Sequence, residues 1–169
     1  MAERLYYFAN SAAVTTAAPV GQPTGTSIRT MLQLQIPAAP AGITIAEWGI
    51  SFDAAAVSTP VKCELFGTTV AATLTTAAQA ADIVKYNQIA SASGLTLATN
   101  GTAFASAAGT EGTVANARMF DQQYVAPTNQ YVKQWPLGRE PYCDVSTYVR
   151  IRVTVGTTVN CFCYIIWSE

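Results

Sequence analysis

Apolar and polar side chains alternate with a period of two along four stretches of this chain, and the alternation constrains the fold more than any other feature. Residues 27–36 are the clearest case, because Leu32 and Leu34 fall on one face and Gln33 and Gln35 on the other. Successive side chains of a β-strand point to opposite faces of its sheet, so this pattern predicts a strand with one buried face. The same pattern recurs over residues 43–53, 61–66 and 148–155.

A further strand is expected over residues 159–167, which are apolar on both faces, and such a strand lies either at the centre of a sheet or in an interface. The turn at Gly156 to Thr158 predicts a terminal hairpin between this strand and the preceding one. Weaker patterns predict strands at 70–75 and 130–135 and a short helix at 77–88, with Gly49 as a candidate β-bulge. About eight strands separated by turns are typical of an all-β, single-domain β-sandwich, jelly-roll or Ig-like, spanning residues 1–169.

Two segments lack a strand pattern. Residues 10–26 are rich in Ala, Thr, Pro and Gly and are predicted to form an extended N-terminal arm. Residues 76–118 form a long, weakly patterned Ala/Thr-rich excursion, and its inner part, residues 91–116, has too few large apolar side chains to fold alone. This inner part is expected either to lie over a neighbouring subunit or to form a pair of weak strands at the rim of the fold.

The low charge of the chain argues against several classes of partner. Only 11% of the residues are charged, against about 25% in ordinary soluble domains, so we expect a bland surface that protein partners cover. The formal net charge is −1 and Lys and Arg occur singly, which argues against nucleic acid and membrane surfaces as partners. The longest wholly apolar run, Cys161 to Trp167, is much shorter than the roughly 20 residues of a transmembrane helix. Glu3 stands where a signal peptide would be basic, so no secretion signal is expected.

The chain contains no histidine, which removes the usual general base, the Ser–His and Cys–His nucleophile pairs and most transition-metal sites. Cys63, Cys143, Cys161 and Cys163 include no CxxC pair, so we expect buried, reduced thiols rather than disulfides or a zinc site. Ten acidic residues allow a carboxylate pair in principle, but chance proximity explains such a pair better. We therefore predict no catalytic residues, no metal and no cofactor, and a protein that is not an enzyme.

Residues 124–140 concentrate the residue types that anchor protein interfaces. Tyr, Trp and Arg contribute most to such interfaces, so Tyr131, Trp135 and Arg139 are candidate interface residues. An ordinary strand and turn with a core Trp and a surface ion pair explains them equally well. Trp48 alternates with Ile50 and is expected in the core.

Three further side chains are candidate interface residues because of their position. Trp167 lies close to the last residue, is hard to bury by its own chain and is the stronger aromatic candidate. Arg150 and Arg152 are expected on the outer face of one strand. A solvated stripe is the simplest interpretation of this Arg pair, and a salt-bridged subunit contact is the alternative.

Three pieces of the sequence carry a family resemblance. They are Glu47-Trp-Gly-Ile-Ser-Phe-Asp53 with Pro60-Val-Lys-Cys-Glu-Leu65; Ala126-Pro-Thr-Asn-Gln-Tyr-Val-Lys-Gln-Trp-Pro-Leu-Gly-Arg-Glu140; and Arg150-Ile-Arg-Val-Thr154 with Val159-Asn160 and Tyr164-Ile-Ile-Trp167. The chain resembles, over about residues 43–67 and 120–169, a family of small structural proteins of tailed phages and prophages of actinobacteria. The resemblance implies a virion context and transfers no catalytic residue.

Within that context, the composition predicts a capsid decoration, or cement, protein. Such a protein would be a homotrimer on the capsid surface, assembled in the host bacterial cytoplasm, that binds the major capsid protein and bridges capsomers through many weak contacts. The arm and the excursion are the segments expected to add a strand to a capsid subunit or a trimer mate. Two alternatives stay open: a tail- or head-fibre-associated sandwich that binds host carbohydrate through Tyr131 and Trp135, and a tail tube or baseplate component.

Overall fold

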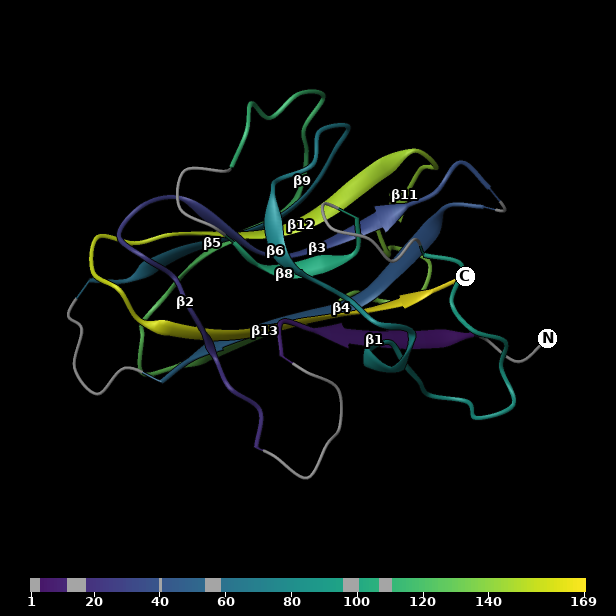
Figure 1. Ribbon diagram of the computed structural model, residues 1–169, viewed down its shortest axis with the longest axis horizontal. Helices are drawn as coiled ribbons and strands as arrows, with labels where there is room; N and C mark the ends of the chain where they lie inside the picture. The colour runs from purple at the N-terminus through teal and green to yellow at the C-terminus, as the bar shows by residue number, and fades with distance from the viewer. Residues whose placement is uncertain (1–3, 12–17, 40, 54–58, 96–100, 107–110) are drawn as a thin grey trace.

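Two antiparallel β-sheets pack face to face, which confirms the predicted β-sandwich (Figure 1). The computed structural model describes residues 4–11, 18–39, 41–53, 59–95, 101–106 and 111–169. Sheet A has the strand order β10 (Gln130–Gln134), β4 (Ile43–Phe52), β13 (Asn160–Ser168), β1 (Leu5–Ala9) and β7 (Val84–Lys85), with β2 (Gln22–Pro23) beside β13 and β11 (Tyr142–Cys143) beside β4. Sheet B has the order β6 (Leu74–Ala77), β8 (Ala103–Ser106), β3 (Arg29–Ile36), β12 (Thr147–Thr154), β5 (Val61–Thr68) and β9 (Arg118–Val125).

The inner faces of the two sheets meet in one large apolar core. In sheet B, Leu32, Ile151 and Leu65 stand side by side across β3, β12 and β5. In sheet A, Ile165 of β13 pairs with Trp48 of β4, and all five side chains are fully buried. Burial of one such side chain contributes roughly 1.5–3 kcal/mol to folding. The expected core position of Trp48 is confirmed.

Most strands that the alternation predicts are present, and the weaker patterns are less reliable. The stretches 27–36, 43–53, 61–66, 130–135, 148–155 and 159–167 correspond to β3, β4, β5, β10, β12 and β13. The strand expected at 70–75 is displaced to β6, and the helix expected over 77–88 is reduced to the 3-10 turn Ala80–Asp82. This helix does not form because Val84 and Lys85 pair with β1 as strand β7.

The terminal hairpin predicted around Gly156 is wrong. Strand β12 lies in sheet B between β3 and β5, whereas β13 lies in sheet A between β4 and β1. Both flanks of β12 are already hydrogen-bonded, so the next strand buries its inner face by joining the opposite sheet. The turn therefore carries the chain from sheet B to sheet A. The last strand was expected either at the centre of a sheet or in an interface, and it lies at the centre of sheet A.

The described parts of the N-terminal arm lie against sheet A of the same chain. Gln22 and Pro23 pair with the first residues of β13. The buried Asn10 side chain donates to the carbonyl oxygen of Cys161 (2.9 Å) and accepts from the backbone N–H of Cys163 (2.8 Å). Thr24, also buried, exchanges hydrogen bonds with the backbone of Val159. The described part of the arm therefore lies against sheet A, and residues 12–17 of the predicted arm lie outside the described part of the chain.

The Ala/Thr-rich excursion also folds onto its own chain. Strands β6 and β8 add to sheet B beyond β3, and β7 adds to sheet A beyond β1. These are short strands of two to four residues at the rim of the sandwich. Of these three strands only β8 falls within residues 91–116, where a pair of weak rim strands or a contact with a neighbouring subunit was expected, and residues 96–100 and 107–110 lie outside the described part of the chain.

Candidate interaction surfaces

The chemistry available in the described residues is limited. They include no group of three or more His, Cys, Asp or Glu side chains that could hold a metal ion. All four cysteines are buried and free, as expected. Burial raises the pKa of the Cys143 thiol to about 12, and it raises the pKa of Cys63 and Cys161 as well. These thiols are therefore held in the unreactive, protonated form. Within the described ranges, no helix is long and apolar enough to cross a membrane.

Trp167 is buried by its own chain, so its prediction as an exposed interface residue is wrong. The side chain is 0% exposed. Its ring stacks on that of Tyr6 with the centroids 5.8 Å apart, and its Nε1 donates to Oε1 of Glu169 at 3.1 Å. Trp167 is buried because β13 is a central strand. Sheet B covers its inner face, and β1 and β4 flank it on both sides.

Arg150 is not part of a solvated stripe; it is 0% exposed. Its Nε and Nη2 donate to Oγ1 of Thr30 at 3.0 and 2.7 Å, and its Nη2 forms an ion pair with the Glu111 carboxylate. Nη1 donates to the carbonyl oxygen of Val70 at 3.3 Å, and the guanidinium lies 5.2 Å from the ring centroid of Phe66. The contacts to Val70 and Glu111 come from the segments that follow β5 and precede β9, which cover this face of sheet B. Arg150 therefore supports the fold and is unavailable to a partner.

Arg152 belongs to the same internal network. Its Nε donates to Oε2 of Glu64 at 3.0 Å, and Nζ of Lys62 lies 2.8 Å from the other oxygen of that carboxylate. Burial by itself would raise the pKa of Glu64, but the hydrogen bonds from Lys62 and Arg152 outweigh it and lower the pKa. The contact that the sequence suggested between subunits is therefore made within the chain.

The β9–β11 edge, defined as residues 118–145, carries most of the exposed large hydrophobic side chains in the part of the chain that the structure describes. Strand β9 ends sheet B and β10 ends sheet A, and the hydrogen bonds of Asp121 with Trp48 (3.1 Å) and Tyr131 (2.8 Å) bring them to one side of the sandwich. Six of the ten exposed large hydrophobic side chains among the described residues belong to this edge. They are Met119, Tyr124, Val132, Leu137, Tyr142 and Val145. The edge also carries three basic and three acidic residues, so it has no net charge.

The three interface candidates of the predicted segment lie on this edge with different exposure. Tyr131 and Trp135 are half-buried and pack against the core, and the ring of Tyr131 stands edge-on to that of Trp48 with the centroids 5.5 Å apart. Burial and the bond to Asp121 raise the pKa of Tyr131 to about 12. Arg139 is exposed on the turn after β10. Tyr131 and Trp135 thus fasten the edge to the core.

A group of tyrosines on the outer face of sheet A was not singled out by the sequence. The rings of Tyr7 on β1 and Tyr164 on β13 lie 5.4 Å apart. The Tyr164 hydroxyl donates to Oε1 of Glu47 at 2.6 Å, and Gly49 leaves the space for the Tyr164 ring. The predicted bulge at Gly49 is wrong, because the register shift of β4 falls at Ala46. Only the pairing of β1 with β13 brings these tyrosines together.

No family model, curated protein or solved structure matches this chain.

Proposed function

We propose that this chain is a structural protein of a phage virion, a capsid decoration protein that binds the major capsid protein on the outer shell and ties neighbouring capsomers together. The observation that carries the proposal is the β9–β11 edge, which has no net charge and holds six of the ten exposed large hydrophobic side chains of the described residues. The phage-family resemblance supports a virion context, and its second region, residues 120–169, contains most of this edge.

The chemistry of the edge suits repeated, modest contacts on a lattice. Leu137, Tyr142 and Val132 offer apolar area, whose burial contributes about 25 cal/mol per Å². Arg139 and Glu140 offer charges of both signs, which set orientation more than affinity. A homotrimer that presents three such edges to a symmetric shell gains affinity through effective concentration without any new contact.

Strand β9 adds a second mode of contact. It has eight residues and no described strand pairs with its outer side, so that side suits an added strand. The charges of Arg118 and Asp121 and an irregularity at Phe120 limit nonspecific pairing along it. We therefore assign the strand addition expected from the arm and the excursion to β9 instead, since the described parts of those segments pair with their own sheets.

The first test is the number of copies of this protein per major capsid protein in purified virions. Copies comparable to the capsid subunit support decoration. Dozens of copies or fewer would overturn decoration in favour of a tail or fibre protein, and absence from the particle would refute a virion role altogether.

The second test asks whether the β9–β11 edge is the binding surface. Leu137 and Ile89 are both 90% exposed, and only Leu137 lies on the edge, so Ile89→Asp is a matched control for Leu137→Asp. Particles lacking the protein are incubated with each purified variant, and occupancy is measured by densitometry. We expect at least a tenfold loss of apparent affinity for Leu137→Asp and none for Ile89→Asp. Equal occupancy by both variants would remove the edge from the proposal.

A further inference from the structure

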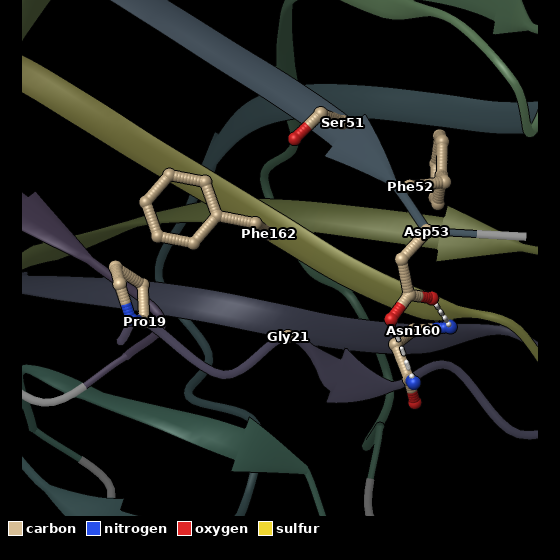
Figure 2. Close-up of a pocket in the computed structure, with 7 residues that line it drawn as sticks. All are labelled: Pro19, Gly21, Ser51, Phe52, Asp53, Asn160 and Phe162. Carbon is tan, nitrogen blue, oxygen red and sulfur yellow. Dashed lines mark hydrogen bonds between the residues drawn. The ribbon is translucent and has the colours of Figure 1, made fainter. Parts of the chain in front are cut away.

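A groove on the outer face of sheet A lies between the arm and the ends of β4 and β13. Its volume is about 370 Å³, and it is lined by Pro19, Gly21, Ser51, Phe52, Asp53, Asn160 and Phe162. Figure 2 shows Phe162 and Pro19 toward one end of this Phe162 groove and the hydrogen-bonded Asp53 and Asn160 toward the other. Phe162 pairs with Ser51 across β13 and β4, so their side chains stand beside each other on the same face.

The arm forms a fixed wall of this groove. Gly21 approaches β13 so closely that a Cβ atom on it would lie 3.2 Å from Cβ of Asn160. On one side of it, the backbone N–H of Val20 donates to Oγ of the buried Ser11 at 3.2 Å. On the other, the backbone N–H of Thr24 donates to the carbonyl oxygen of Val159 at 2.9 Å. Hydrogen bonds on both sides of Gly21 thus hold this part of the arm in place beside β13.

The polar end of the groove is preorganised to accept hydrogen bonds. The Asp53 carboxylate receives the backbone N–H of Asn160 on Oδ1 (3.2 Å) and the Asn160 side-chain amide on Oδ2 (3.0 Å). Each carboxylate oxygen has a second lone pair, and both groups are exposed to solvent. Asp53 makes no ion pair with any described residue. The fixed carboxylate therefore offers acceptors in a set geometry, and Ser51 lines the same groove.

We propose that the Phe162 groove binds one neutral sugar ring of a glycan. A pyranose has an apolar face of C–H groups, which matches the Phe162 ring and Pro19, and hydroxyls on its rim, which can donate to Asp53 and Ser51. None of the described residues that line the groove is basic, so Asp53 repels anionic sugars and phosphates. This site differs from the carbohydrate platform expected at Tyr131 and Trp135, and it is independent of the capsid contact proposed for the β9–β11 edge.

A single ring held by one aromatic contact and a few hydrogen bonds binds weakly. The dissociation constant is expected on the order of millimolar, since a ligand of this size has few atoms to contribute. Many copies on one particle would raise the apparent affinity for a glycan-coated surface by about 10²–10⁴-fold. The groove would then give a particle a low-affinity, multivalent hold on neutral glycans.

The test is an NMR titration of the isotopically labelled full chain with methyl glycosides of glucose, galactose, mannose and rhamnose. Amide chemical shifts report the binding. We expect saturable shifts for at least one glycoside at Gly21, Asp53 and the Asn160 side chain. Phe162→Leu retains an apolar side chain but removes the ring, and Asp53→Asn removes the charge. Each variant should bind the glycoside at least tenfold more weakly in the same titration. A thermal melt of each sample shows that the variant is folded.

Matched controls are Tyr124→Leu, an exposed aromatic elsewhere, and Asp144→Asn, an exposed carboxylate elsewhere. Both should bind as the unchanged protein does. Absence of shifts with all four glycosides, or shifts that persist in Phe162→Leu, would overturn the proposal. Binding of tetramethylammonium but of no glycoside, lost in Asp53→Asn, would overturn it in favour of a cation site. None of these outcomes affects the copy number in virions, so failure here leaves the decoration proposal separately testable.

Discussion

Replacement of Arg150 by methionine should destabilise the fold strongly, because it removes one half of a buried ion pair. Arg150 is fully buried and its partner Glu111 is 15% exposed at the side chain. The variant takes the nearer of two cations from the Glu111 carboxylate, leaving Nη1 of Arg152 at 3.8 Å from Oε1, and it removes hydrogen bonds to Thr30 and Val70. Loss of one partner of a buried pair costs about 3–5 kcal/mol, a large share of the 5–15 kcal/mol that holds a typical domain together.

The same figure predicts the thermal shift. A chain of this length loses about 2–4 °C of Tm for each kcal/mol, so Arg150→Met should melt about 6–20 °C lower. The exposed pair Arg118–Asp144, whose side chains are 61% and 64% exposed, provides the control. Arg118→Met should cost less than about 1 kcal/mol, as surface ion pairs do. Urea unfolding followed by tryptophan fluorescence measures both free energies.

A double-mutant cycle separates the ion pair from simple loss of packing. Glu111→Gln keeps an acceptor for the backbone N–H of Thr30, which donates to Glu111 Oε2 at 2.7 Å, but removes the charge. Glu111→Gln should lower the free energy of unfolding by at least about 1 kcal/mol less in the Arg150→Met variant than in the unchanged protein. Contacting residues couple by about 0.5–3 kcal/mol. A coupling energy near zero, or a cost of Arg150→Met below about 1 kcal/mol, would refute the buried ion pair.

Glu64, the thiols and Gly49 each lead to one further measurable expectation. Since Lys62 and Arg152 lower the pKa of Glu64 in the folded state, its contribution is present above the ordinary pKa of about 4.3 and is lost as pH falls through the folded value. The free energy of unfolding of the unchanged protein should therefore fall more steeply in acid than that of Glu64→Gln. All four thiols are buried and burial raises the pKa of Cys63, Cys143 and Cys161, so a disulfide reagent at about pH 8 should modify the cysteines only after denaturation. Gly49→Ala would place a Cβ 2.7 Å from Cζ of Tyr164, so this ring must turn and lose its hydroxyl hydrogen bond, at a cost of about 1–3 kcal/mol in urea unfolding.

Each of these expectations has a clear contrary result. Parallel acid profiles for Glu64→Gln and the unchanged protein would mean that the carboxylate gains nothing from its two cations. Rapid modification of any cysteine in the folded chain would place that thiol at the surface. Unchanged stability of Gly49→Ala would show that the Tyr164 ring turns freely.

The two-residue alternation of apolar and polar side chains located those strands whose buried and exposed faces alternate regularly. Strand β9 was missed because its apolar residues do not alternate with its polar ones, and only Val125 among its eight residues is buried. Its alternation is also broken at Phe120, where the register with β5 shifts. Strand β1 was missed for another reason: Tyr6 is buried whereas Tyr7 is half-buried, and two tyrosines do not read as an alternation. Period two requires a contrast in polarity, which neither strand supplies.

The sequence by itself determined the class of fold, the reduced state of the thiols and the inward position of Trp48, because alternation and residue type are local properties. It could not determine which sheet β13 joins, since a strand that is apolar on both faces pairs equally well in either. The burial of Arg150 was likewise decided only by tertiary structure, as the residues that cover it, Val70 and Glu111, lie 80 and 39 positions away in the chain. The Phe162 groove has the same origin, because it exists only where the arm is laid against the ends of β4 and β13.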